Sequence, residues 1–333
     1  MKKLFSIIIF LSLNTAVFGF TMPARSTARA ESVIPYIIDS DFKTAITSID
    51  SMTRIDPEDP FPYILKLTAL GMRDIDFDRT IDSAAFLSTY QKAIDCSNKL
   101  ENTSGKTSYS RMMVGLCRVM HASFYLRSKS YFAAMQNGFD ALDILDEARR
   151  IDSNNTEVLM FLGMYDFARA ELKSRLWWVL FWYPGNVDAG IEKLKRCSQE
   201  STLMRTAAKI SLSEIYIKEN KLKAADSLLG ALEKQHPQSR FVQWSRVKYF
   251  EAQKNFNKAA KIYEMLAHSY QKTPEGQYNS FVTRYKAAEM FRNSGEITSA
   301  KSVCQDLLNE PDLANYKEVL KDTQRLWERV QKQ

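Results

Sequence analysis

Residues 225–232 read ADSLLGAL, and the same pattern returns at 259–266 (AAKIYEML) and 300–307 (AKSVCQDL). In each copy a leading alanine is followed by apolar residues four and seven positions later, which lie on one face of a helix. A small residue recurring on that face lets a second helix approach closely. The pattern therefore predicts repeated pairs of packed helices. Nine residues before the three alanines stand the aromatic residues Tyr216, Phe250 and Phe291.

The period of the pattern indicates the class of repeat. The step from Ala225 to Ala259 is 34 residues, and the step from Ala259 to Ala300 is 41 because the turn-rich stretch QKTPEGQY lies between them. Pro237 follows Ala225 by twelve residues, where it ends a helix. In its 34-residue step, its alanine and its turn, the C-terminal half resembles the tetratricopeptide repeat (TPR) superfamily. The resemblance implies an all-α fold, a right-handed α-solenoid of TPR-like helix pairs.

Weaker copies of the pattern extend the array toward the N-terminus, since AITSIDSMTRIDP (45–57) and ALDILDEARRIDS (141–153) keep the twelve-residue step. We expect helix pairs at 33–55, 60–101, 107–151, 156–201, 205–235, 240–271 and 280–309, and a final helix over 316–331. The expected divisions are a signal peptide and linker (1–30), N-terminal pairs (31–101), central pairs (107–201) with an aromatic insertion (174–185), and a C-terminal array with a capping helix (205–333). A loop at 97–108 is the expected boundary after the N-terminal pairs.

The first residues predict export. Lys2 and Lys3 precede an uncharged apolar run, and small residues follow, as in a secretory signal peptide. Cleavage is expected after Gly19 or as late as Ala30. The alternative is a signal anchor that stays in the membrane, for which the apolar run is short. The expected location is periplasmic or secreted, with membrane association as the alternative.

Charge and composition narrow the class of partner. The formal net charge of +7 falls to +3 without residues 1–30, which hold four basic residues and no acid (7 − 4). The remaining charges alternate in sign along the chain, which is typical of solvated helix faces and argues against a nucleic-acid partner. Only 11 Gly and 9 Pro in 333 residues favour helices over turn-rich sheets.

The stretch SRLWWVLFWYPGNVDAG (174–190) holds three of the five tryptophans. It lengthens the connection inside the fourth helix pair, and its apolar run is less than half of the roughly 20 residues that a membrane span needs. Three interpretations stay open: a plug buried against neighbouring repeats, an anchor for a protein partner, or insertion into a membrane interface. The residues concerned are Trp177, Trp178, Phe181, Trp182 and Tyr183.

A narrower resemblance surrounds this stretch. The aromatic turn, Pro184-Gly185 and the following GIEKLKRC (190–197) are similar to the middle of the TPR family that contains outer-mitochondrial-membrane and inclusion-clearance proteins and bacterial exported relatives. Gly185 and Gly190 match the glycines of that family. Asn186 and Val187 stand where the family has an acidic-basic pair.

The sequence offers no motif for catalysis or a cofactor. His121, His236 and His268 lack metal-ligand spacing, and no catalytic-serine, phosphate-loop or dinucleotide motif occurs. The four cysteines are expected to be small buried residues, with Cys96 and Cys117 as the one pair to test for a disulfide. We therefore expect a protein that is not an enzyme and holds no metal or cofactor.

The segment RDIDFD (73–78) superficially resembles a calcium loop because it carries carboxylates at alternate positions, Asp74, Asp76 and Asp78. Arg79 stands where the loop needs a glycine for its sharp turn. We therefore expect these carboxylates to lie in a solvated loop.

Stacked helix pairs leave a concave groove lined by first helices, which suits a segment of another protein. The expected function is a non-enzymatic exported scaffold or adapter that binds a protein partner in the cell envelope. The candidate partner-binding residues are Tyr216, Trp244, Arg284 and Tyr285, with Trp177, Trp178, Phe181, Trp182 and Tyr183 as a second contact. The alternative is peripheral membrane docking through the Trp-rich insertion.

Overall fold

The computed structural model describes residues 20, 22–79, 82–175 and 186–333, apart from the side chains of 172–175. This part of the chain forms fifteen α-helices and two short 3-10 helices, and contains no strand. The first eight helices are α1 (Ala24–Ile38), α2 (Phe42–Ile55), α3 (Pro60–Asp76), α4 (Ser83–Ser104), α5 (Ser108–Arg127), α6 (Tyr131–Ile151), α7 (Leu159–Arg175) and α8 (Val187–Glu200). The others are α9 (Arg205–Lys218), α10 (Leu222–Gln235), α11 (Arg240–Ala252), α12 (Phe256–Gln271), η1 (Pro274–Gly276), α13 (Gln277–Asn293), α14 (Ile297–Leu308), η2 (Pro311–Asn315) and α15 (Lys317–Gln331).

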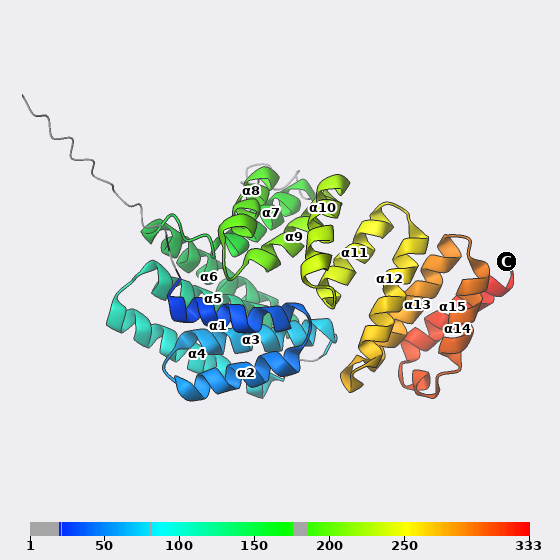
Figure 1. Ribbon diagram of the computed structural model, residues 1–333, viewed down its shortest axis with the longest axis horizontal. Helices are drawn as coiled ribbons and strands as arrows, with labels where there is room; N and C mark the ends of the chain where they lie inside the picture. The colour runs from blue at the N-terminus through cyan, green and yellow to red at the C-terminus, as the bar shows by residue number, and fades with distance from the viewer. Residues whose placement is uncertain (1–19, 21, 80–81, 176–185) are drawn as a thin grey trace, which may run out of the picture.

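Successive helices lie side by side as pairs, and the pairs follow one another along the molecule (Figure 1). The pairs run from α1–α2 to α13–α14, and α15 packs on α13 and α14 at the end of the array. The predicted all-α solenoid of helix pairs is confirmed. Apart from the start of the first pair, the ends of each predicted pair lie within a few residues of the observed ones.

The leading alanines lie where the two helices of a pair cross. Ala225, Ala259 and Ala300 are fully buried. Five positions before each alanine stands a turn residue with positive φ, namely Asn220 (56°), Lys254 (58°) and Gly295 (86°). The left-handed residue ends the first helix and reverses the chain, and the alanine then allows the second helix to cross at close range.

Two glycines bring the backbones of α7 and α8 into contact. A Cβ atom on Gly190 would stand 2.8 Å from the carbonyl oxygen of Gly163 and 2.9 Å from the backbone nitrogen of Phe167. Both distances are shorter than a carbon atom tolerates, so only glycine permits this crossing. Gly163 and Gly190 thus replace the alanine that serves the same purpose in the C-terminal pairs.

The expected boundary at residue 30 falls inside a helix. Helix α1 begins at Ala24, and Arg29 is buried within it, paired with Asp59 and lying 3.8 Å from Asp56. Cleavage after Ala30 would remove the first part of α1 together with this pairing, whereas cleavage after Gly19 leaves the helix intact. The predicted signal sequence, residues 1–19, lies outside the described residues.

The expected loop at 97–108 is mostly helix. Helix α4 continues to Ser104, and residues 105–107 alone connect it to α5. Ser97 is fully buried, and its hydroxyl donates to the carbonyl of Ala93 at 2.7 Å. Serine and asparagine favour turns because their side chains compete for backbone groups. Here the serine hydroxyl is satisfied inside the helix, so the turn signal was misleading.

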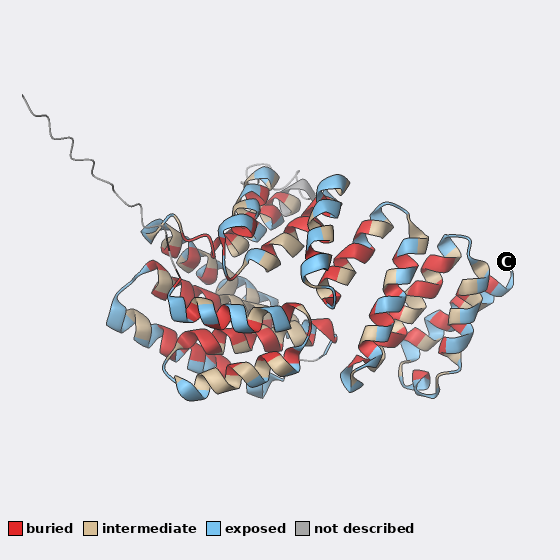
Figure 2. Cartoon of the chain, in the orientation of Figure 1, coloured by how far each residue is buried: buried red, intermediate tan, exposed pale blue. Residues whose placement is uncertain are grey.

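The array does not extend as an open rod, because the N-terminal pairs also contact α11 to α13. The Ser239 hydroxyl donates to the carbonyl of Ile38 at 2.6 Å, and His236 lies 3.1 Å from Asp39. Buried residues line the spaces between helices along the whole molecule (Figure 2). One apolar cluster includes residues from Val33 of α1 to Val330 of α15.

Candidate binding surfaces

Asp76 is buried, although we predicted it to be solvated. It is the last residue of α3, and its side chain is 1 % exposed. Asp74 is buried as well, and Asp78 of the same segment is exposed. The predicted solvated loop is therefore wrong for Asp74 and Asp76, because the end of α3 docks against α11, α12 and α13.

Donors from three helices converge on Asp76, and we call Asp76, Arg240, Tyr270 and Asn279 the clasp. Arg240 Nε lies 3.1 Å from Oδ1 and 2.8 Å from Oδ2 of Asp76, and Arg240 Nη2 also donates to Oδ2. The Tyr270 hydroxyl donates to Oδ1 at 3.0 Å, and Asn279 Nδ2 donates to the backbone carbonyl of Asp76 at 3.2 Å. Both oxygens of the carboxylate thus accept hydrogen bonds from other side chains of the chain.

Aromatic rings complete the clasp. The Arg240 guanidinium lies 5.0 Å from the ring centroid of Phe77 and 4.9 Å from that of Tyr270, within cation-π range. Trp244 Nε1 donates to the Tyr270 hydroxyl at 3.0 Å. Trp244, which we predicted to bind a partner, is therefore half-buried beside the clasp. The residues of the clasp contact one another and leave this side of Trp244 occupied by the chain itself.

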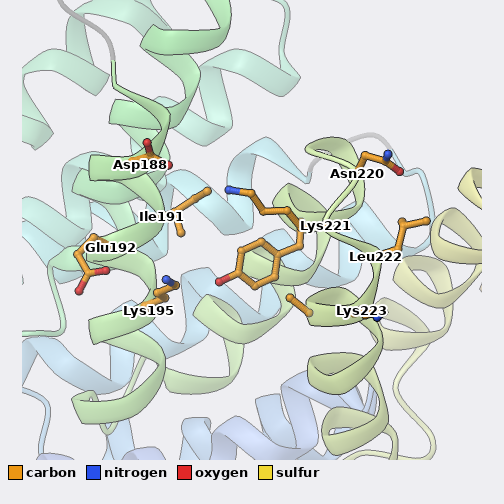
Figure 3. A pocket seen from close by; sticks show the side chains of 10 residues that line it. Asp188, Ile191, Glu192, Lys195, Asn220, Lys221, Leu222 and Lys223 are labelled. Carbon is orange, nitrogen blue, oxygen red and sulfur yellow. The ribbon is translucent and has the colours of Figure 1, made fainter.

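A groove of about 630 Å³ lies between α8 and the turn that joins α9 to α10 (Figure 3). We call it the Tyr216 groove, because it brings the predicted residue Tyr216 together with side chains that the sequence analysis missed. Helix α8 contributes one face to it, with residues at helical spacing, and the turn together with the start of α10 contributes consecutive residues. The lining residues are Asp188, Ile191, Glu192, Lys195, Tyr216, Asn220, Lys221, Leu222, Lys223 and Ala224.

The charged residues of the Tyr216 groove are available to a ligand. Lys195, Lys221, Lys223, Asp188 and Glu192 form no ion pair with another described residue. The side chain of Lys221 reaches toward α8 in Figure 3. Burial, followed by the charge of Glu192, raises the pKa of Tyr216, which keeps its hydroxyl neutral at physiological pH.

The groove along the first helices α7, α9 and α11 is smaller, about 330 Å³. Phe167 and Ile215 give it apolar surface. Its charges neutralise one another, since Lys248 lies 2.7 Å from Glu214 and Lys218 lies 2.5 Å from Glu171. A ligand with charged groups would have to displace these pairs.

The other predicted partner-binding residues do not share a surface with Tyr216. Arg284 pairs with Glu310 at 2.5 Å and lines a separate groove of about 280 Å³. Tyr285 is half-buried and packs against two apolar clusters, one of which extends along the molecule. The aromatic residues Trp177, Trp178, Phe181, Trp182 and Tyr183 lie outside the described residues, so their role stays a prediction.

The described residues bring together no group of three or more His, Cys, Asp or Glu that could hold a metal ion. The four cysteines are free and buried, and burial raises the pKa of Cys117 and Cys197 to about 12. Thiols held protonated in this way are poor nucleophiles. Among the described helices, none has both the length and the apolar character that a membrane span needs.

Comparisons with known proteins return distant structural likenesses. The sequence matches no protein-family model and no curated protein. A thermophilic TPR protein of Thermus thermophilus is 15 % identical with a TM-score of 0.41, over 68 % of this chain and 98 % of that one. The C-terminal part of a TPR repeat-containing protein from Cytophaga hutchinsonii is 13 % identical with a TM-score of 0.40, over 87 % and 98 %. Human IFIT1, as a dimer with PPP-AAAA, is 12 % identical with a TM-score of 0.40, over 81 % and 68 %.

At these scores the likenesses carry no argument about what the chain binds. The narrower resemblance around Gly185 and Gly190 to the outer-mitochondrial-membrane and inclusion-clearance family stays a prediction.

Proposed function

We propose that the chain is a non-enzymatic helical-repeat scaffold that binds a protein partner, and that the Tyr216 groove holds a segment of this partner. One observation carries the proposal: the charged side chains of this groove are unpaired within the described chain, whereas those of the first-helix groove pair with one another. Unpaired charges attract opposite charges on a bound protein segment, and their positions around an apolar side chain fix the register in which the segment binds.

The two walls of the Tyr216 groove specify the complementary segment. Lys221 belongs to the α9–α10 turn and Lys223 to the first turn of α10, whereas Asp188 and Glu192 belong to the first turns of α8. A segment with acidic residues facing the turn and a basic residue facing the start of α8 pairs with both walls. An apolar side chain between them would contact Ile191 and Tyr216.

Charge reversal within the groove tests the proposal. The variant Lys195→Glu with Lys221→Glu and Lys223→Glu is compared with the unchanged protein in a crosslinked pull-down from extract of the source cells. The matched control reverses three exposed lysines elsewhere, Lys43→Glu, Lys92→Glu and Lys261→Glu, so that the net charge changes equally. We expect a stoichiometric partner with the unchanged protein and the control, and at least a tenfold loss with the groove variant.

Two outcomes contradict different parts of the proposal. If the unchanged protein captures no stoichiometric partner, the chain is not a scaffold of this kind. If the groove variant captures the partner as well as the control does, the partner binds elsewhere.

A further part of the proposal is that the chain is exported and meets its partner in the cell envelope or outside the cell. The apolar sequence of residues 4–13, which resembles that of a signal peptide, supports export. An intact α1 favours cleavage after Gly19 over cleavage after Ala30. N-terminal sequencing of protein from fractionated cells tests this. We expect a chain that starts at Phe20 in the envelope or secreted fraction, and a chain that keeps Met1 in the cytoplasm would contradict export.

A further inference from the structure

The first half of α6 exposes a row of apolar side chains. Tyr131 is 65 % exposed, Phe132 76 %, Met135 51 % and Phe139 45 %. We call these four residues the α6 stripe. Phe132, Met135 and Phe139 are spaced by three and four positions, so they share one face of the helix.

The α6 stripe faces away from the core. Ala141, Leu145 and Ala148 are the buried residues of α6, and they lie on the opposite face, toward α5. The next helix pair reaches only the end of the stripe, where the ring of Phe139 meets the edge of Tyr165 at a centroid distance of 6.3 Å. Clustered apolar side chains at such exposure are typical of an interaction surface.

Opposite charges stand at the two ends of the stripe. Lys129 is exposed in the turn before α6, and Asp143 is exposed four positions after Phe139, on the same face. Lys129 stands two residues before the first residue of α6, and Asp143 stands twelve residues after that first residue. The row is therefore positive at one end, apolar in the middle and negative at the other end.

We infer that the α6 stripe is a two-fold interface that packs antiparallel against the α6 stripe of a second copy of this chain. With the axis between Met135 and Gln136, Phe132 of one copy faces Phe139 of the other, because both are equally distant from the axis. In the same register Lys129 of one copy stands across from Leu142 of the other, next to Asp143, and this juxtaposition occurs at both ends of the dimer. A surface that matches itself under a two-fold rotation is what an isologous dimer requires.

The inference stands on α6 alone and does not depend on the Tyr216 groove. The four apolar side chains supply the attraction, since they leave water on both copies at once. The charged ends supply the orientation, because a parallel arrangement would bring Lys129 against Lys129 and Asp143 against Asp143.

Sedimentation equilibrium of the purified protein tests the interface. We expect a monomer–dimer equilibrium whose dissociation constant rises about 100-fold in Phe132→Ser with Phe139→Ser, because two central aromatic contacts are lost in each copy. The control variant, Ile55→Ser with Met265→Ser, removes apolar side chains that are 77 % and 52 % exposed on other helices, and should dimerise normally. A protein that stays monomeric at millimolar concentration, or a dimer that survives the stripe substitutions, overturns the inference.

A charge swap tests the antiparallel geometry. Lys129→Glu and Asp143→Lys each place like charges together at both ends of the dimer, and we expect each to weaken dimerisation about tenfold. The double variant restores opposite charges and should dimerise almost as well as the unchanged protein. A double variant that is weaker than either single variant would overturn the antiparallel arrangement.

Crosslinking locates the axis. Met135→Cys should give a dimer with a short bismaleimide, whereas Ile55→Cys should not, and the four native thiols are buried.

Flotation with vesicles of phosphatidylcholine and phosphatidylglycerol tests the competing occupant, a membrane. A monomer that floats, and loses flotation in Phe132→Ser with Phe139→Ser, overturns the dimer in favour of lipid.

Discussion

The clasp and the α6 stripe reverse the usual distribution of residues. At the clasp a carboxylate is 1 % exposed, and on α6 a phenylalanine is 76 % exposed. Charged groups are rarely this buried without a partner, and large apolar side chains seldom gather on an open surface. In a stack of helix pairs, a residue is therefore buried when another helix packs against its position. Its polarity matters less.

The two regions also differ in what completes them. The charge of Asp76 is compensated inside the chain by Arg240, its carboxylate also accepts a hydrogen bond from Tyr270, and its backbone carbonyl accepts one from Asn279. The α6 stripe has no equivalent cover among the described residues. We therefore expect substitutions in the clasp to lower the free energy of unfolding most. Substitutions in the α6 stripe should change the stability of the monomer least.

Removing one partner of the clasp should have the largest effect. Asp76→Ala leaves the Arg240 guanidinium buried without its counter-charge, and we expect it to lower the free energy of unfolding by about 3–5 kcal/mol. The double variant Asp76→Leu with Arg240→Met removes both charges and should recover most of this loss. Urea denaturation followed by circular dichroism measures both. A loss below about 1 kcal/mol in Asp76→Ala would mean that the clasp is not closed in solution.

A smaller effect is expected at the crossing of α7 and α8. Gly190→Ala should lower the free energy of unfolding by about 1–3 kcal/mol, because its Cβ would overlap the backbone of α7. The matched control is Gly230→Ala in α10, where a Cβ meets nothing within 4 Å. It should raise stability by roughly 0.5–1 kcal/mol. Equal thermal midpoints for the two variants would contradict the close crossing.

His121 stands between the two extremes, as a partly buried polar group without a counter-charge. Its ring stacks on Tyr90 at a centroid distance of 4.1 Å and meets Tyr125 in a tilted arrangement at 4.4 Å. Burial, with a further contribution from Arg118, lowers the pKa of His121 despite a hydrogen bond with Asn137. The unfolded chain therefore binds this proton more readily than the folded one. The contribution of His121 to stability is complete above the unfolded pKa of about 6.5 and is lost as the pH falls below it.

The His121→Phe variant keeps the ring stacking and removes the titration. We expect its unfolding free energy to fall less than that of the unchanged protein between pH 7.5 and pH 5, as measured by urea denaturation at both values. Identical decreases would show that His121 does not contribute to the pH dependence.

The smallest effect is expected on the α6 stripe of the monomer. At protein concentrations too low for association, Phe132→Ser should change the unfolding free energy by no more than about 0.5 kcal/mol, because its ring is already in water. Leu145→Ala on the buried face of the same helix should cost about 2–5 kcal/mol. If Phe132→Ser destabilises the dilute monomer as strongly, part of the chain covers the stripe.

The fold was predictable because its signals are local. The alanines, the residues of the turns and the 34-residue step lie within single helix pairs, so one sequence is enough to find them. The clasp was not predictable, because Asp76 and Arg240 are 164 residues apart and no local pattern says which edges of a stack meet. The polar residues of RDIDFD predicted a solvated loop instead.

The candidate site was predictable only in part. Tyr216 followed from the repeat, yet the repeat marks packing positions, and it gave no reason to examine α8. A signal did exist there, since Asp188, Glu192 and Lys195 fall on one face of a helix. The sequence does not say which residues lie opposite this face. Only the three-dimensional structure shows the neighbouring turn, and that these groups lack ion-pair partners.

The clasp also sets an order of events in biosynthesis. A ribosome that adds roughly 5–20 residues per second needs about 8–33 seconds to pass from Asp76 to Arg240. During that interval the early helices can fold, but the tip of α3 with its carboxylate and the ring of Phe77 faces water or a chaperone. The clasp therefore closes only after α11 has been made, and a nascent polypeptide stalled before α11 would expose that unprotected tip to proteases and aggregation.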